Sequence, residues 1–400
     1  MIEPKLRFKA NDGSQFPDWE EKNVEDICSV STGKGNTQDK VDTGAYRFYV
    51  RSPIIEHSDS YLFDEEAVIT VGDGVGTGKV FHYVKGKYNL HQRCYRMYDF
   101  RSVTGKYFYY FFSTNFYRRV KSMSAKTSVD SVRMEMITKM KISVPCLPEQ
   151  QKIAEFLSTI DTVIEKQKET VSAWEERKKG VMQKLFSQEV RFKADDGSEF
   201  PDWEEKSFSD VFENLNNSTF SRDCLNYEAG NVKYIHYGDI LTKFGFAIDV
   251  QSSNVPYVND DLDCEKYASL SDGDIVIADT AEDDTVGKAV EIMNTHCGKT
   301  ISGLHTIACH PKEKFASKYL GYFMNAGIYH NQLRPYMQGI KVTSVSKTNI
   351  ALTKILVPCL EEQQKIADCL SSLDEVIEKQ KATLAAWEEL KKGLLQQMFV

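Results

Sequence analysis

The chain has 400 residues, enough for two or three domains that each bury a core of their own. Its 41% hydrophobic and 27% charged residues are typical of a folded protein and exclude the apolar-poor composition of a disordered chain. No stretch approaches the roughly 18 consecutive apolar residues of a membrane span, and the first ten residues lack a secretory-signal pattern, so we expect a cytoplasmic protein. The formal charge of −8 alone argues against nucleic acid as a partner, since nucleic-acid binding usually leaves a basic footprint.

Two internal repeats organise the chain. Arg7–Lys22 and Arg191–Lys206 are identical at 14 of 16 positions, and Val144–Phe186 matches Val357–Phe399 at 29 of 43 positions. Between them lie two segments, 23–143 and 207–356, that share little sequence. A nearly identical frame therefore holds two dissimilar inserts, which argues against a solenoid or propeller of many short repeats. It suggests a frame with one fixed partner and inserts with a variable one.

The second repeat predicts a pair of long helices. Apolar residues follow a 4,3,4,3 spacing through five heptads in each copy, which is the pattern of a coiled coil. The first helix leads away from the first insert and the second begins beyond the second insert, so we expect the two to run antiparallel. The predicted seam consists of Ile153, Leu157, Ile160, Ile164, Val171, Trp174, Ile366, Leu370, Leu373, Ile377, Leu384 and Trp387.

Each insert is predicted to be a mixed α+β domain. In the first insert we predict strands at Tyr46–Arg51, Ala67–Val71, Lys79–Val84 and Arg93–Tyr98, followed by a helix at Lys106–Lys121. In the second insert we predict strands at Lys233–Tyr237, Asp274–Ala278, Lys288–Met293 and His305–Cys309, followed by a helix at Phe315–Ala326.

Charge divides unevenly between the inserts. The first has 18 basic and 13 acidic residues, a net charge of +5, whereas the second has 13 basic and 18 acidic residues, a net charge of −5. A basic run with interleaved aromatic residues near the end of the first insert suits contact with phosphates and bases, although such runs are more often solvated faces. If the inserts bind DNA, the contacts that we predict are Lys79, Arg118, Arg119, Lys126, Arg133, Lys288, Arg334, Lys341 and Lys347.

Catalytic and metal-binding motifs are not found. The glycine-rich segment Gly72–Lys79 resembles a P-loop but lacks its first glycine and the Ser or Thr after the lysine. The run Pro17–Lys22 has the letters of a nuclease site, yet six contiguous residues cannot place two carboxylates on adjacent strands. Nine cysteines without a CxxC pair predict reduced thiols and no zinc site. We therefore expect a chain without an active site or metal of its own.

Two unlike inserts, each followed by a helix that opens with Val-Pro-Cys-Leu-x-Glu-Gln-Gln-Lys-Ile-Ala, resemble the specificity subunit of type I restriction-modification enzymes. The blocks Pro-Asp-Trp-Glu-Glu-Lys and Ser302–Ile307 are also similar to that family, and the resemblance covers essentially the whole chain. It implies an α+β protein with two target-recognition-type α/β domains separated by an antiparallel coiled coil, with pseudo-two-fold symmetry. The implied domains are an N-terminal frame segment at 1–22, recognition domain 1 at 23–143, a central spacer helix at 144–186, a linker at 187–206, recognition domain 2 at 207–356 and a C-terminal spacer helix at 357–400.

The resemblance implies a non-catalytic reader of bipartite double-stranded DNA. Each recognition domain would read one half-site, and the helices would set the gap and dock two methyltransferase subunits and the restriction subunits. S-adenosylmethionine, ATP and Mg would be bound by those partners. Two alternatives stay open at this point: a coiled-coil scaffold for other proteins, which the acidic second insert favours, and a repressor that binds DNA alone.

Overall fold

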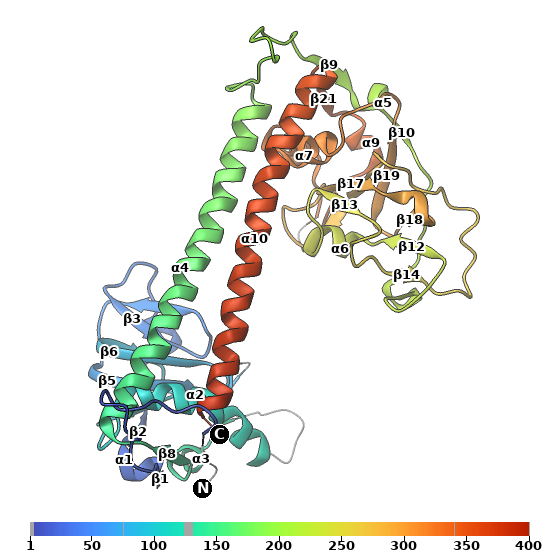
Figure 1. Ribbon diagram of the computed structural model, residues 1–400. Helices are drawn as coiled ribbons and strands as arrows, with labels where there is room; N and C mark the ends of the chain where they lie inside the picture. The colour runs from blue at the N-terminus through green and yellow to red at the C-terminus, as the bar shows by residue number, and fades with distance from the viewer. Residues whose placement is uncertain (1–3, 75, 124–130, 340, 400) are drawn as a thin grey trace. The chain divides into compact units, whose positions relative to one another are not determined.

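The computed structural model describes residues 4–74, 76–123, 131–339 and 341–399. The chain divides into two units, one formed by Met1–Glu169 with Lys381–Val400 and the other by Thr170–Gln380. Two long helices, α4 (Leu147–Phe186) and α10 (Leu360–Met398), each contribute to both units (Figure 1). Each unit thus contains β-sheet structure and one segment of each long helix.

The first unit is built on a six-stranded sheet in the order β2-β7-β5-β6-β3-β4, in which β3 runs parallel to β6 and the other pairs are antiparallel. Its strands are β2 (Ser29–Thr32), β3 (Tyr46–Tyr49), β4 (Ile55–Ser58), β5 (Phe63–Val71), β6 (Phe81–Leu90) and β7 (Cys94–Tyr98). A separate ribbon pairs β1 (Glu20–Asn23) with β8 (Lys141–Val144). The short helices are α1 (Val24–Ile27), η1 (Thr37–Asp39) and α3 (Met134–Thr138).

Helix α2 (Gly105–Met123) forms the core of the first unit with this sheet. Phe108, Phe112 and Phe116, which follow a four-residue spacing and therefore share one helix face, are all fully buried. The cluster that contains them also takes in Val68 of β5 and Met97 of β7, together with apolar residues from both long helices. The helix thus ties the sheet of this unit to its helix pair.

The second unit has a five-stranded sheet in the order β10-β19-β15-β17-β13 and a four-stranded sheet in the order β11-β14-β12-β18. Its strands are β9 (Glu204–Ser207), β10 (Phe212–Asn214), β11 (Leu225–Asn226), β12 (Val232–Ile235), β13 (Ala247–Asp249), β14 (Tyr257–Val258), β15 (Ile275–Ala278), β16 (Thr280–Ala281), β17 (Ala289–Met293), β18 (Lys299–Ser302), β19 (Thr306–Pro311), β20 (Thr343–Ser344) and β21 (Lys354–Val357). Its short helices are α5 (Phe208–Val211), η2 (Arg222–Cys224), α6 (Tyr237–Thr242), η3 (Thr295–Cys297), α7 (Tyr319–Asn325), α8 (Gly327–Leu333), η4 (Arg334–Tyr336) and α9 (Lys347–Ile350).

The predicted elements are confirmed, although β5, β6 and α7 differ in length from their predictions. Every predicted strand overlaps an observed strand, and the helix predicted at 106–121 is α2. The helix predicted at 315–326 is shorter and begins at Tyr319, because Lys318 before it adopts a left-handed conformation with φ of 72°. The ribbon β21-β9 in the second unit has the same register as β1-β8, since Glu204 lies opposite Val357 as Glu20 lies opposite Val144.

The long helices run antiparallel within each unit. In the first unit Asp161 of α4 pairs with Lys391, and Lys168, further along α4, pairs with Glu388, which comes earlier in α10. In the second unit Lys178 pairs with Asp374, and Leu185 shares a core cluster with Ile366 and Leu370. The predicted direction is therefore confirmed.

The predicted seam residues face inward. Ile153, Leu157, Ile160, Ile164, Val171, Ile366, Leu370 and Ile377 are buried, whereas Trp174, Leu373, Leu384 and Trp387 are half-buried.

Candidate nucleic-acid interface

Two of the predicted DNA contacts in the first unit are exposed beside the C-terminal half of α2. Lys79 ends the glycine-rich loop, and its ammonium lies 4.9 Å from the centroid of the Tyr117 ring. Arg118 follows Tyr117 and donates a hydrogen bond to the Asn115 side chain at 3.3 Å. The structure therefore brings these two cations to neighbouring positions on the surface.

The remaining predicted contacts of the first unit are less uniform. Arg119 is half-buried, and its Nε donates to the carbonyl oxygen of Met136 at 2.8 Å, which ties α2 to α3. Arg133 is exposed, with its guanidinium 3.6 Å from the Glu135 carboxylate. Lys126 lies outside the described residues. Arg119 thus has a clear structural role in addition to any contact with DNA.

In the second unit, Lys288 differs from the other predicted contacts. Its half-buried ammonium donates to the carbonyl oxygens of Phe244 at 2.8 Å and Leu241 at 3.3 Å, and burial lowers its pKa. These bonds hold the end of α6 against β17, so this lysine has a structural role that the sequence did not indicate. The other three predicted contacts, Arg334, Lys341 and Lys347, are exposed.

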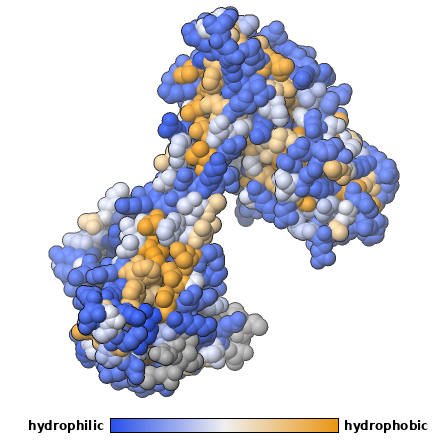
Figure 2. All heavy atoms as spheres, viewed as in Figure 1, coloured by the Kyte–Doolittle hydropathy of each residue, from blue (hydrophilic) through white to orange (hydrophobic). Residues whose placement is uncertain are grey.

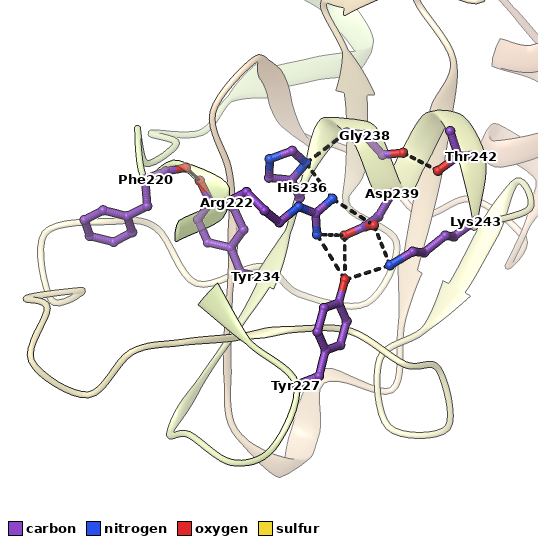
Figure 3. Close-up of polar contacts among 9 residues, drawn as sticks. All are labelled: Phe220, Arg222, Tyr227, Tyr234, His236, Gly238, Asp239, Thr242 and Lys243. Carbon is purple, nitrogen blue, oxygen red and sulfur yellow. Dashed lines mark hydrogen bonds and ion pairs between the residues drawn. The ribbon is translucent and has the colours of Figure 1, made fainter. Parts of the chain in front are cut away.

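A polar cluster that sequence reasoning missed lies around Asp239 of α6 (Figure 3). The Arg222 guanidinium donates to both oxygens of this carboxylate, at 2.8 and 3.0 Å, and the Lys243 ammonium lies 2.9 Å from Oδ1. Lys243 also donates to the hydroxyl of Tyr227 at 2.7 Å. His236 caps α6, since its Nδ1 accepts from the amide of Gly238 at 3.0 Å.

This cluster holds two cations on one buried carboxylate. Asp239 is only 1% exposed, whereas the side chains of Arg222 and Lys243 are 43% and 47% exposed. Burial acts to raise the pKa of Asp239, but the hydrogen bonds from Arg222 and Lys243 outweigh it and lower the pKa. The acidic second insert thus presents a locally cationic surface. No short motif signals it, because its members come from three separate segments.

The frame segments of the two units make matching contacts. Arg7 forms a bidentate pair with the fully buried Glu149 of α4, at 3.0 and 2.8 Å, and Trp19 donates its indole N–H to the same carboxylate at 3.0 Å. In the second unit Arg191 and Trp203 bind the fully buried Glu362 of α10 in the same way, at 3.1, 2.8 and 2.9 Å. The recurring Pro-Asp-Trp block is therefore a structural docking element, as its place in the frame predicts.

A second pair of matching contacts joins each domain to its helices. In the first unit Asp161 accepts a hydrogen bond from the Tyr110 hydroxyl at 2.7 Å and lies 2.5 Å from the Lys391 ammonium. In the second unit Asp374 accepts from the Tyr322 hydroxyl at 2.6 Å and from Lys178 at 2.6 Å. Two unlike domains are thus attached to their helix pairs through the same three residue types.

Neither a metal site nor a membrane helix is found in the part of the chain that the structure describes. No three His, Cys, Asp or Glu side chains among these residues are placed to hold a metal ion. No helix among them is long and apolar enough to cross a membrane.

Known proteins with similar sequences and structures share this architecture. The family model described as "Type I restriction modification DNA specificity domain" matches twice, at residues 17–172 and 201–386. The chain is 25% identical to the type I restriction enzyme MjaVIII specificity subunit of Methanocaldococcus jannaschii over 427 aligned positions, which cover 97% of this chain and 94% of the relative.

Two solved structures share the fold. The S subunit of a type I restriction-modification system from M. genitalium superposes with a TM-score of 0.57 and 14% identity, over 100% of this chain and 99% of that one. A chain from a structure that describes complex assembly and conformational transition of the type I R-M system has a TM-score of 0.54 and 14% identity, over 96% of this chain and 98% of that one. With two matches of the family model that together span most of its length, the chain belongs to the type I restriction-modification DNA specificity family.

Proposed function

We propose that this chain is the DNA-specificity subunit of a type I restriction-modification complex. In this proposal the domain between β1 and β8 and the domain between β9 and β21 each read one half of a bipartite, gapped DNA site. The paired helices set the length of the gap. The α4 helix has 40 residues, and at about 1.5 Å per residue it is about 60 Å long, roughly the length of 18 base pairs at 3.4 Å each.

The observation that carries the proposal is the contrast between frame and insert. The Arg-Glu-Trp and Tyr-Asp-Lys contacts recur in both units with nearly the same distances. The sheets that they hold differ, with six strands in the first unit and sheets of five and four strands in the second. A fixed frame with unlike domains suits a protein that keeps its partners while the sequence that it reads varies.

The frame also supports docking of two copies of one partner. Leu147 at the start of α4 is 50% exposed, and Leu360, its counterpart at the start of α10, is 43% exposed. In the view of Figure 2, apolar residues gather over α4 and α10 in each unit. Like surfaces on two frames favour two identical methyltransferase subunits, to which restriction subunits would add.

In this proposal the chain itself carries out no chemistry. S-adenosylmethionine would be bound by the methyltransferase subunits, and ATP and Mg would be bound by the restriction subunits. The chain would supply sequence recognition and the geometry of assembly.

The test is to co-express the full chain with the methyltransferase subunit of its system and to map methylated bases in the host DNA. We expect a stable complex and methylation at one asymmetric motif that has two defined halves and an undefined gap. A complex that shows no DNA-sequence preference would support a protein scaffold instead. Tight sequence-specific binding by the chain alone would support a repressor.

A further inference from the structure

The two recognition domains share one edge of backbone structure, although their sequences differ. In the first unit the amide of His91 donates to the carbonyl oxygen of Tyr49 at 2.9 Å. In the second unit the amide of Gly303 donates to the carbonyl oxygen of Ile235 at 3.0 Å. Just beyond, the amide of Gly72 donates to the carbonyl of Arg93 at 2.9 Å, as the amide of Asp279 donates to that of His305 at 3.1 Å.

A third segment completes this edge in both units. Asp73 lies in a β-bridge with Ser131, and Thr280 lies in the same position opposite Ser344. Ser131 and Ser344 stand at equal distances before the repeated helices, so sequence and structure agree on this correspondence. Arg51 and Tyr237 correspond, because each comes two residues after the matching acceptors Tyr49 and Ile235. Asp73 corresponds to Thr280 through the bridge to the serine, and Arg93 corresponds to His305 because their carbonyls accept the matching hydrogen bonds. We call these residues, with Asp279, the reading edge.

In the first unit the reading edge is an arginine pair on one carboxylate. The guanidinium of Arg93 lies 3.1 Å from Asp73, and that of Arg51 lies 3.4 Å from it. The Arg93 side chain is 64% exposed, whereas Asp73 is 22% exposed. One carboxylate therefore orients two arginines whose remaining N–H groups face solvent. The glycine-rich loop that ends at Lys79 lies next to Arg51. A Cβ atom added to Gly76 of this loop would lie only 3.7 Å from the carbonyl oxygen of Arg51.

In the second unit the same positions have no permanent cation. The Tyr237 ring lies 5.3 Å from the His305 ring, edge to face, and the Thr280 hydroxyl donates to Asp279 at 2.7 Å and lies 3.4 Å from the His305 ring nitrogen. His305 is 47% exposed and has a φ of 54°, a left-handed conformation that is uncommon outside glycine. The ring of Tyr237 also lies 4.7 Å from His236, which joins this edge to the Asp239 cluster of Figure 3.

Resting on the proposed function, we propose that the reading edge is the base-contacting surface of each recognition domain. Arg93 contacts a guanine in the half-site of the first unit, because a guanidinium matches the O6 and N7 acceptors of guanine in the major groove. His305, at the same backbone position, contacts a base of the other half-site with the help of Thr280 and Tyr237. The nearby exposed Lys79 and Lys341 contact phosphates, which position the domain without reading sequence.

The experiment compares methylation rates of the full complex on duplexes that carry single base-pair changes in either half-site. With Arg93→Ala we expect discrimination to fall roughly ten-fold or more at one guanine of one half-site, with the other half-site read normally. Arg93→Lys should lose the same discrimination, because an ammonium cannot make the paired contact, whereas a phosphate-binding arginine would tolerate lysine. His305→Ala should relax one position of the other half-site only.

Matched controls come from the opposite ends of the same sheets. Arg93 comes just before the start of β7, and Arg101 comes just after its end. His296 comes just after the end of β17, at the end of the sheet opposite to His305. Arg101→Ala and His296→Ala should leave both half-sites unchanged. Unaltered discrimination in Arg93→Ala and His305→Ala, or equal relaxation in both half-sites, would overturn the assignment. Because the other positions of the same half-site report on folding of the same domain, a loss confined to one position of that half-site is not a folding defect.

These outcomes separate the inference from the function on which it rests. If the unsubstituted complex methylated DNA without sequence preference, the proposed function would fail. If it methylated a gapped motif that the reading-edge variants left intact, only this assignment would fail.

Discussion

At the scale of single residues, the frame depends on two fully buried carboxylates. Glu149 and Glu362 each receive two hydrogen bonds from an arginine and one from a tryptophan indole. A buried charge is costly unless it is paired in this way, so removing one partner leaves the other charge uncompensated. The N-terminal segment and its repeat are therefore part of the folded units.

We expect Glu149→Ala to lower the free energy of unfolding of the first unit by about 3 kcal/mol, because Arg7 and Trp19 would lose their acceptor. Hydrogen exchange should quicken in residues 7–22 and stay slow in residues 191–206. Glu155→Ala, at an exposed position of the same helix, is the control and should change stability little. Equal effects of the two substitutions would contradict the account.

Glu291 of β17 should make the second unit sensitive to pH. It is 3% exposed and caps α7 by accepting from the amides of Lys318 and Gly321, and burial raises its pKa from 4.5 to about 7. The folded state then binds a proton that the unfolded state releases between these two pH values. The free energy of unfolding should therefore fall as pH rises from about 4.5 to about 7, and stay low above that.

Glu291→Gln should remove this dependence. The amide does not titrate, so the free energy of unfolding of the variant should stay constant between pH 5 and pH 8, whereas that of the native chain should fall by up to about 3 kcal/mol, the value of the shift at 1.36 kcal/mol per unit. Urea unfolding at the two pH values measures this difference. A constant difference between the two chains at both pH values would show that Glu291 does not titrate in this range.

Lys79 offers a simple electrostatic test. Its exposed ammonium is predicted to contact phosphate, so Lys79→Ala should weaken binding of the complex to all DNA sequences and reduce the slope of log affinity against log salt by about one unit. Lys139 is 63% exposed and pairs with Glu25 at 2.6 Å, and Lys139→Ala serves as the matched control. If neither substitution changed the slope of log affinity against log salt, Lys79 would not contact phosphate.

Single contact residues were the least predictable part of the molecule. Lys79 of the glycine-rich segment and Arg118 of the basic run are exposed, but a lysine in a sequence gives no sign that its ammonium will be half-buried on carbonyl oxygens, as in Lys288. The Asp239 cluster and the reading edge were missed because they join segments that are distant in sequence. Only the fold brings Arg51, Asp73 and Arg93 together.

At the scale of elements, the long helices were predictable because their apolar spacing is strict over five heptads. The central strands were predictable from short apolar runs, whereas β4 and the first half of β5, with its three acidic residues, lack such runs and were missed. The helix predicted at 315–326 started too early relative to α7, because nothing in the residue type of Lys318 signals a left-handed conformation.

The lysines within the helix repeats show how the helices hold the domains. Lys178 and Lys391 each lie four residues after a seam tryptophan and so continue the heptad spacing. Each pairs with an aspartate of the facing helix that also accepts from a tyrosine. These polar residues are therefore neither free in solvent nor buried without partners. They fix each domain to both helices of its unit.

We expect Asp161→Ala to destabilise the first unit by about 2 kcal/mol, since it leaves the Tyr110 hydroxyl and the Lys391 ammonium without their acceptor. Chemical denaturation measures the loss. Glu165, which is 69% exposed and pairs with Lys168 at the surface, provides the control, and Glu165→Ala should cost less than about 0.5 kcal/mol. A similar loss from both substitutions would mean that the Tyr-Asp-Lys contact adds nothing beyond a surface ion pair.

At the scale of the whole molecule, the net charge of −8 gives little information about DNA binding. The two inserts carry +5 and −5, so the total equals that of the frame. The second unit nevertheless holds Arg222 and Lys243 on its surface through one buried aspartate. Local arrangement, which net charge cannot report, decides where phosphate is attracted.

The central claim is that equivalent frames hold interchangeable readers. The ribbons β1-β8 and β9-β21 have the same register, so residues 207–356 can replace residues 23–143 without a change in either junction. The most direct test is to build this chain with the second domain in both positions, co-express it with the methyltransferase subunit and map methylated bases. The account predicts a palindromic motif made of two copies of the second half-site; an unchanged asymmetric motif, or methylation without sequence preference, would contradict it.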